Sequence, residues 1–148
     1  MKSVDLLLFL LLRKVRLIKT EKIYNYYEFA LQKWCSDDYK IHGLWPQINS
    51  AEYPTYCEPV DYTEPSGDLL DAMKVNWKEC NNDLWEHEWE KHGSCMKQQN
   101  NMSENNFFNL TLELFDVIKD NTKLDDKCKE KNCIVGCFDL NYDYIKCP

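Results

Sequence analysis

All three histidines of the 148-residue chain lie in two short segments that are rich in tryptophan. The first segment, residues 41–47 (IHGLWPQ), contains His42, and the second, residues 85–95 (WEHEWEKHGSC), contains His87 and His92. Histidine is the side chain that exchanges protons near neutral pH. The clustering therefore predicts that acid–base chemistry takes place where the two segments meet.

The spacing of His87 and His92 argues against a zinc site. The metalloprotease motif His-Glu-x-x-His places both imidazoles on one helical face, at positions i and i+4. Here the second histidine is at i+5, which turns the two side chains about 140° apart on an α-helix. A zinc hydrolase remains an alternative that would require chelator-sensitive activity. No metal and no cofactor is expected.

The same spacing suits proton transfer without a metal. Glu88 and His92 are i, i+4 neighbours on a helix. His87 and Lys91 are spaced in the same way, and His42 is expected to face them from the end of a strand. Cleavage of RNA by its own 2′-hydroxyl needs a base, an acid for the leaving 5′-oxygen, and positive charge near the phosphorane. Two histidines can be base and acid, because a pKa of about 6.5 lets one be neutral while the other is charged.

Charge and cysteine content narrow the class of protein. The net charge of −7 is the wrong sign for a protein that holds many phosphates at once, but it allows an enzyme that meets a few nucleotides in one cleft. Eight cysteines without a Cys-x-x-Cys pair indicate disulfides rather than a zinc ribbon. Possible glycosylation sequons begin at Asn101 and Asn109. A secreted or lumenal protein (extracellular, lysosomal or vacuolar) is expected.

The N-terminal residues 1–23 are expected to lie outside the folded domain. Leu6 to Leu12 form an apolar run like that of a signal peptide, and this run is too short to span a bilayer. Residues 24–148 are sufficient for one domain with its own core. We expect this domain to be a monomer without stable membrane association.

Hydrophobic patterning predicts an α+β domain. Aromatic residues with partial alternation predict a strand over residues 24–34, and a second strand is expected over 40–45, ended by Pro46. Two further short strands are expected at the C-terminus, over residues 133–138 and 142–147.

Three helices are expected between these strands. The first runs from about residue 66 to 79 and should dock on the sheet. The second covers 84–92 with Gly93 as its C-terminal stop, so it carries the second histidine segment. The third, capped by Ser103, ends near residue 120. The side chains of the third helix that should face the core are Phe107, Leu110, Leu114, Phe115 and Ile118.

The two histidine segments resemble the active-site segments of the ribonuclease T2 family, in the same order. The resemblance covers roughly Tyr26 to Pro148 and includes the turn Tyr53-Pro54-x-x-Cys57. It implies a central antiparallel sheet packed by several helices and stapled by disulfides. It also implies an endoribonuclease that cuts single-stranded RNA with little base preference, through a 2′,3′-cyclic phosphate.

The resemblance also implies a role for each residue of the site. His92 would be the general base and His42 the general acid. Lys91 and Glu88 would support the phosphorane, and His87 would contact the phosphate. The alternative that we retain is a disulfide-stapled binding or signalling module, catalytically weak, on the same fold.

Base pockets and disulfides are implied in the same way. The first base pocket would contain Trp45, Gln47 and Tyr53, and the second would contain Gln32 and Leu84. The family usually has an aromatic residue where Leu84 stands, so we expect the second base to stack poorly. The implied disulfides are Cys57–Cys95 and Cys137–Cys147, and the pairs suggested for the remaining cysteines are Cys35–Cys80 and Cys128–Cys133.

Overall fold

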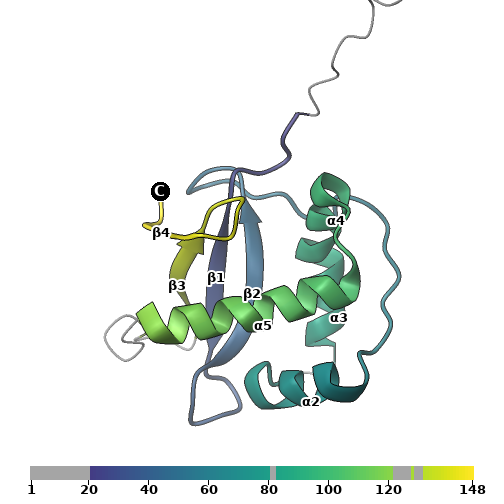
Figure 1. The fold of residues 1–148 in the computed structure, drawn as a ribbon, viewed down its shortest axis with the longest axis vertical. Coiled ribbons are helices and arrows are strands. Elements are labelled where there is room, and N and C mark those ends of the chain that lie inside the picture. The colour runs from purple at the N-terminus through teal and green to yellow at the C-terminus, as the bar shows by residue number, and fades with distance from the viewer. Residues whose placement is uncertain (1–20, 81–82, 122–127, 129–131) are drawn as a thin grey trace, which may run out of the picture.

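The computed structural model describes residues 21–80, 83–121, 128 and 132–148. The apolar run of the N-terminal segment lies outside the described residues. The sheet contains β1 (Tyr26–Gln32), β2 (Lys40–Gln47), β3 (Asn132–Phe138) and β4 (Tyr144–Ile145), in the order β2-β1-β3-β4 with antiparallel pairing throughout (Figure 1). The helical elements are α2 (Gly67–Asn76), α3 (Leu84–Glu88), the π-helical turn η1 (Trp89–Gly93), α4 (Ser94–Asn100) and α5 (Glu104–Asn121). The expected α+β architecture is confirmed.

Contrary to the expectation from the sequence, Pro46 does not end the second strand. β2 continues to Gln47, and Pro46 pairs with Tyr27 of β1. β2 is the edge strand of the sheet, so one side of its backbone needs no ladder partner and proline is tolerated.

The pairing of β2 with β1 contains a β-bulge at His42. Ala30 pairs with Gly43 and Leu31 pairs with Ile41, which leaves His42 as an extra residue without a partner on β1. Strict alternation would place His42 on the same face as Leu44, which is fully buried in the core. The bulge instead places the His42 ring beside Trp45, with ring centroids 5.1 Å apart.

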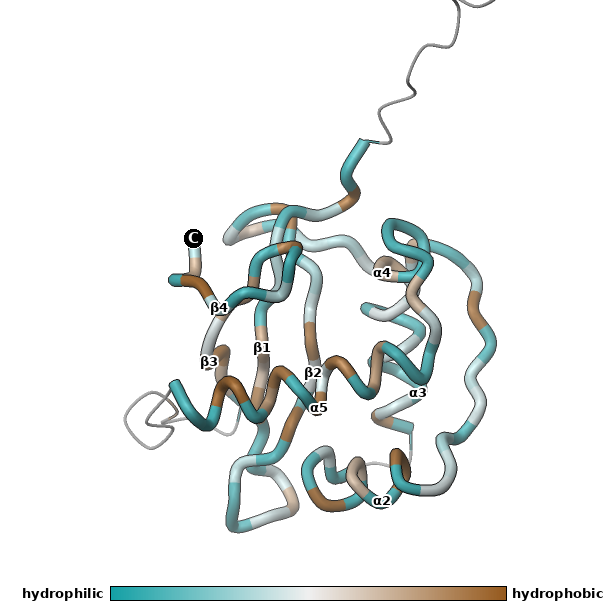
Figure 2. The backbone as a smooth tube through the Cα atoms, in the orientation of Figure 1, coloured by the Kyte–Doolittle hydropathy of each residue, from teal (hydrophilic) through white to brown (hydrophobic). Residues whose placement is uncertain are grey.

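The core lies between the sheet and the helices, with α5 crossing the strands (Figure 1). Hydrophobic and hydrophilic segments alternate along α5 in Figure 2, as expected for a helix with one buried face. Ser103 accepts a hydrogen bond from the backbone N–H of Asn106 at 3.3 Å, which confirms the predicted cap. Phe115 stacks on Phe29 of β1. The fully or largely buried side chains of α5 are Phe107, Phe108, Thr111, Leu114, Phe115 and Ile118, while the predicted Leu110 is half-buried.

The first predicted helix, α2, packs mainly against α5 rather than directly on the sheet. It ends at Asn76, three residues before the predicted end at Glu79. Its C-cap Trp77 is fully buried and donates a hydrogen bond from Nε1 to the His42 carbonyl at 2.9 Å. The link between this helix and the sheet is therefore the indole of Trp77.

Gly93 does not stop the second helix, which is the largest error in the predicted elements. The helix continues from α3 through η1 into α4. It ends at Asn101, whose φ of 55° lies in the left-handed region. Gly93 is required for another reason, because a Cβ at this position would overlap the indole ring of Trp89. The glycine permits close packing inside a helix, and Asn101 supplies the C-terminal turn.

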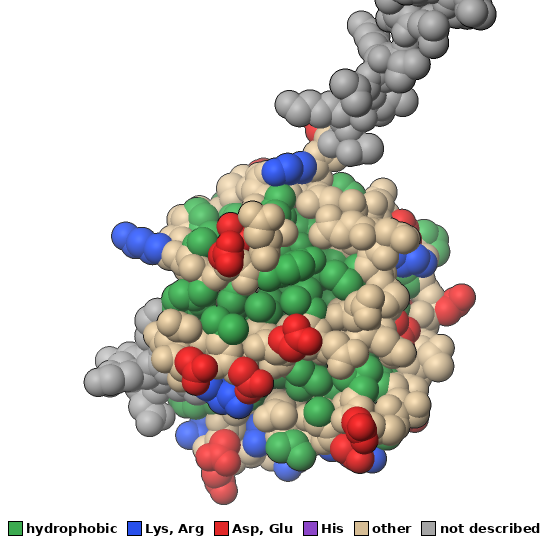
Figure 3. Space-filling view, viewed as in Figure 1, with side chains coloured by type: hydrophobic (Ala, Val, Ile, Leu, Met, Phe, Trp, Pro, Cys, Tyr) green, Lys and Arg blue, Asp and Glu red, His purple; other side chains and the backbone are tan. Residues whose placement is uncertain are grey.

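The structure contains the four disulfides Cys35–Cys80, Cys57–Cys95, Cys128–Cys133 and Cys137–Cys147. The second of them ties the loop after β2 to the start of α4. Figure 3 shows hydrophobic side chains gathered across the middle of the face that carries α5, and no histidine is visible on that face. Within the described residues, no helix has both the length and the apolar character that a membrane span requires.

Candidate active site

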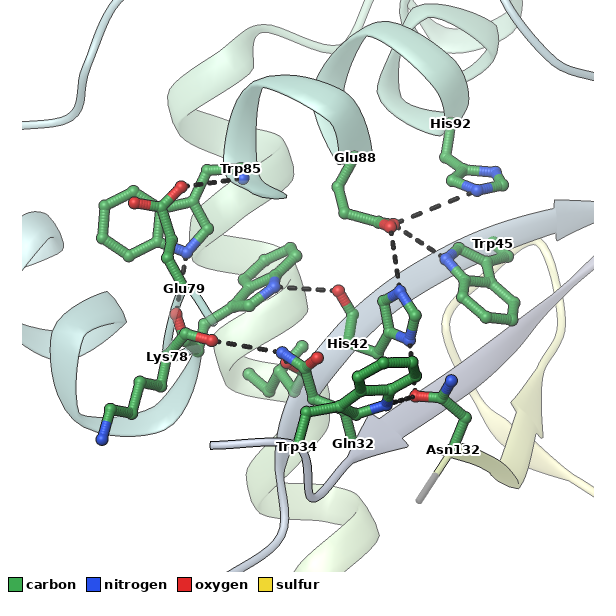
Figure 4. A network of polar contacts seen from close by, with 12 residues as sticks. Gln32, Trp34, His42, Trp45, Lys78, Glu79, Trp85, Glu88, His92 and Asn132 are labelled. Carbon is green, nitrogen blue, oxygen red and sulfur yellow. Dashed lines mark hydrogen bonds and ion pairs between the residues drawn. The ribbon is translucent and has the colours of Figure 1, made fainter. Parts of the chain in front are cut away.

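The carboxyl group of Glu88 lies between the two histidine segments (Figure 4). Its Oε1 is 3.6 Å from Nε2 of His42, and its Oε2 is 4.0 Å from Nε2 of His92. Trp45 donates a 2.8 Å hydrogen bond from Nε1 to Oε2. Only 1% of the Glu88 side chain is exposed, so this group links His42, His92 and Trp45 away from solvent.

Gly43 makes room for this carboxyl group. A Cβ at position 43 would overlap Oε2 of Glu88 and would lie 2.5 Å from Nε1 of Trp45. Both contacts are closer than non-bonded atoms can approach. The glycine of the first segment is therefore required by the side chain of the second segment.

Burial decides the protonation of Glu88. Removal from water disfavours its charged form and raises its pKa from 4.5 to about 8, although the hydrogen bond from Trp45 and the charge of Lys91 act in the opposite direction. Burial therefore favours the protonated form of Glu88. In that state it can donate a hydrogen bond.

Burial has the opposite effect on His92, because the charged form of an imidazole is the protonated one. It lowers the pKa of His92 from 6.5 to about 2, and the positive charge of Lys91 acts in the same direction. The His92 ring stacks on Trp45 with centroids 5.4 Å apart, and its buried Nδ1 has no hydrogen-bond partner among the residues that the structure describes. Burial therefore favours the neutral form of His92 in the unliganded protein.

His42 is more exposed than His92, and its pKa is also lowered. Burial is the main cause, and the hydrogen bond to Asn132 acts against it. Nδ1 of His42 lies 3.2 Å from Oδ1 of Asn132. Its Nε2 is directed toward Glu88, so the two ring nitrogens face different partners (Figure 4).

The π-helical turn η1 carries Lys91 and His92. Such turns interrupt the regular helix and are frequent at functional sites. Tyr56, in the loop that follows β2, donates its backbone N–H to the Lys91 carbonyl at 2.9 Å. The adjacent bond between Cys57 and Cys95 holds that loop against the same helical segment. The backbone around the site is thereby fixed from two sides.

The four predicted catalytic residues of the second segment do not all face the same way. Glu88 and His92 converge on His42, as the i, i+4 spacing predicts. His87 is exposed, and its ring packs edge-on against Tyr56 with centroids 6.5 Å apart. It thus lies outside the group around Glu88.

A pocket of about 310 Å³ opens beside His92 and Lys91. Its walls include all three residues expected in the first base pocket: Trp45, Gln47 and Tyr53. Tyr53 is 54% exposed, so its ring is free to meet a base. Glu28 of the central strand β1 also lines the pocket, a residue that the sequence reasoning missed because it lies in neither segment.

Gln32 and Leu84, the residues expected in the second base pocket, both contact other parts of the protein. The Gln32 amide donates to the carbonyls of Ile41 and Lys78, at 3.1 and 3.2 Å. Leu84 is half-buried and packs against the core. Their assignment to a second base site stays a prediction.

Two further residues missed from the sequence are Trp34 and Asn132. Trp34 donates from Nε1 to Oδ1 of Asn132 at 2.7 Å, and that same oxygen faces His42. Each residue directly precedes a disulfide cysteine, which is the only sequence feature that marks it. Among the described residues, no group of three or more histidine, cysteine, aspartate or glutamate side chains is arranged to hold a metal ion.

Comparison with known proteins places the chain in a family. Residues 20–132 match the sequence model of the Ribonuclease T2 family. Extracellular ribonuclease LE of Solanum lycopersicum is 41% identical over 66 residues, which cover 39% of this chain and 29% of that protein. Ribonuclease 1 of Arabidopsis thaliana is 37% identical over 86 residues, which cover 52% of this chain and 36% of that protein. The chain thus spans about a third of the length of these relatives.

A solved structure shares the fold. The crystal structure of the SF11-RNase of Nicotiana alata, associated with self-incompatibility, superposes with a TM-score of 0.65. The match covers 84% of this chain and 92% of that chain at 21% identity. The expected antiparallel sheet with packed helices is therefore confirmed.

Proposed function

The chain belongs to the ribonuclease T2 family, and we propose that it is an endoribonuclease that cleaves single-stranded RNA by metal-free proton transfer between two histidines. The observation that carries the proposal is the meeting of His42 and His92 at the Glu88 carboxyl, beside a pocket lined by Trp45. Low base specificity is part of the proposal, since stacking on an aromatic ring accepts every base.

His92 is the general base in this scheme. It is neutral before RNA binds, so it can accept the proton of the 2′-hydroxyl while the 2′-oxygen attacks phosphorus. A bound phosphodiester places negative charge near Lys91 and His92, which raises the pKa of His92 toward the working pH. The pocket next to His92 then holds the base of the nucleotide whose 2′-oxygen attacks.

His42 is the general acid. Its protonated ring gives a proton to the 5′-oxygen as the bond from phosphorus to that oxygen breaks. The products are a 2′,3′-cyclic phosphate and a 5′-hydroxyl. Lys91 and the protonated Glu88 stabilise the phosphorane by charge and by hydrogen bonding, and exposed His87 contacts a phosphate.

The disulfides support a proposal for the compartment. Four cystines require an oxidising environment, and the relatives include proteins named as extracellular and as intracellular ribonucleases. We infer a secreted or lumenal protein that acts as a monomer on single-stranded RNA.

The test is cleavage of single-stranded RNA by three alanine variants. His42→Ala and His92→Ala should each lose roughly 10² to 10⁴-fold in kcat. His87→Ala is the matched control, and it should mainly raise KM because His87 lies outside the group around Glu88. Cleavage by His92→Ala at the parent rate would refute the mechanism. A parent protein that binds RNA without cutting it would favour the binding-module alternative.

A further inference from the structure

His42 is contacted on its Nδ1 side by a pair of residues outside both histidine segments. Asn132 is the first residue of β3, and Trp34 follows β1. The Asn132 Oδ1 lies 2.7 Å from Nε1 of Trp34 and 3.2 Å from Nδ1 of His42. Figure 4 shows the contacts from Trp34 to Asn132, from Asn132 to His42, and from His42 to Glu88.

The chemistry of the indole fixes the orientation of the Asn132 amide. An asparagine side chain offers an oxygen that accepts and a nitrogen that donates, and the two ends are interchangeable in shape. Indole Nε1–H can only donate, so the atom of Asn132 that faces Trp34 must be the oxygen. The same oxygen faces His42 and can only accept. Nδ1 of His42 must therefore carry a hydrogen.

We infer that the Trp34–Asn132 pair sets the tautomer of His42, so that Nε2 is the nitrogen that gains and loses the proton. Nε2 is the atom directed toward Glu88, 3.6 Å from its Oε1. The exchanging proton is therefore held on the side of the ring that faces the site. The tautomer assignment does not depend on the proposed function. The role of Asn132 and Trp34 as positioning residues for the general acid does rest on it.

Covalent and sheet contacts hold the pair in place. Asn132 is opposite Gln32 in the pairing of β3 with β1, two positions before Trp34. Cys35 and Cys133, the residues that directly follow Trp34 and Asn132, are both in disulfides. Trp34 is 60% exposed and contributes little to the core, so its hydrogen bond to Asn132 is its main described contact.

Among the described residues, the charged and titratable groups around His42 are Glu88 from α3, His87 from the same helix, and Lys91 and His92 from η1. Asn132 is the contact from β3 and is uncharged. An aspartate at position 132 would keep the acceptor and add a negative charge beside Nδ1–H. It should raise the pKa of His42 and move the alkaline limb of the cleavage profile to higher pH, whereas leucine should move that limb to lower pH.

The experiment is a two-bond ¹H–¹⁵N correlation spectrum of the full chain with ¹⁵N-labelled histidine. It is recorded at a pH at which the His42 ring is neutral. The parent should show a protonated Nδ1 and an unprotonated Nε2 for His42. Trp34→Phe keeps an aromatic ring but removes the N–H, so the Asn132 amide can turn and the Nε2–H tautomer should appear. Asn105→Leu, an exposed asparagine on α5, is the control and should leave both signals unchanged.

Kinetics on a dinucleotide complete the test. Asn132→Leu should lower kcat by roughly 10 to 10²-fold with little change in KM, since only the orientation and tautomer of the acid change. Asn132→Asp should recover much of kcat with a shifted alkaline limb. In the double variant, Trp34→Phe should add little to the loss caused by Asn132→Leu.

The spectrum separates this inference from the proposed function, because it needs no RNA. An Nε2–H tautomer in the parent, or a Trp34→Phe spectrum identical to that of the parent, would overturn the tautomer assignment even if RNA is cleaved. If the parent does not cleave RNA but shows the Nδ1–H tautomer and the Trp34→Phe change, the proposed function fails and the assignment stands.

Discussion

Replacement of Gly43 by alanine should disable the site while leaving the fold intact. The new methyl group would overlap Oε2 of Glu88 and lie 2.8 Å from Cδ of that side chain. The backbone at position 43 cannot easily retreat, because Gly43 is paired with Ala30 of the central strand. The carboxyl group is the end of a side chain, so it is the part that moves.

The size of the effect follows from the distances. To reach an ordinary contact of about 3.4 Å, the carboxyl group must shift by about 1 Å or more. Displacement of a catalytic group by this amount costs on the order of 10²-fold in rate. Overpacking and the weakened hydrogen bond from Trp45 should cost roughly 1–3 kcal/mol in the free energy of unfolding.

Gly67→Ala is the matched control. Gly67 has a φ of 60° and open space around its Cβ position, so alanine there is strained by roughly 1–2 kcal/mol without touching the site. Urea unfolding should show similar losses for the two variants, and dinucleotide cleavage should show a loss for Gly43→Ala alone. A folded Gly43→Ala protein that cleaves at the parent rate would refute the placement of Glu88.

Three further results are expected. Between pH 4.5 and 8 the folded state keeps the Glu88 proton that the unfolded chain releases, so stability falls with rising pH in the parent and less in Glu88→Gln. Equal slopes in urea unfolding would contradict this. Replacement of Cys57 and Cys95 by serine removes a cross-link that spans 38 residues and should lower the free energy of unfolding by about 4 kcal/mol. Replacement of Cys137 and Cys147, which are 10 residues apart, should lower it by about 3 kcal/mol. The reverse order in thermal unfolding would count against the chain-entropy estimate. The profile of kcat/KM against pH should be bell-shaped with an acidic optimum, because burial lowers the pKa of His42 in the free protein; an alkaline optimum would argue against His42 as the acid.

The meeting of Glu88 and His92 was predictable because its determinants are local. The i, i+4 spacing of Glu88 and His92 on a helix predicted that the two side chains are neighbours, and the structure places them together. The alternating aromatic pattern likewise predicted β1. Ser103 was predicted as a cap from its position before the periodic run of α5, and its hydroxyl accepts the expected hydrogen bond.

The errors arose where packing overrides local preference. Gly93 resembles a helix stop, but the indole of Trp89 requires a glycine there inside a continuing helix. Pro46 resembles a strand stop, but β2 is an edge strand. The orientation of His42 depends on a bulge that only the pairing with β1 defines. Asn132 could not be linked to His42 from the sequence, because 90 residues separate them and the sheet alone brings them together.

The most direct test of the two-histidine mechanism is the chemistry of the product ends. Single-stranded RNA should be digested in the presence of EDTA, and ³¹P NMR of the products of a dinucleotide should identify the phosphate. The account predicts full activity in the chelator and a 2′,3′-cyclic phosphate with a free 5′-hydroxyl on the leaving fragment. Activity lost with the chelator, or products with a 5′-phosphate and a 3′-hydroxyl, would contradict it.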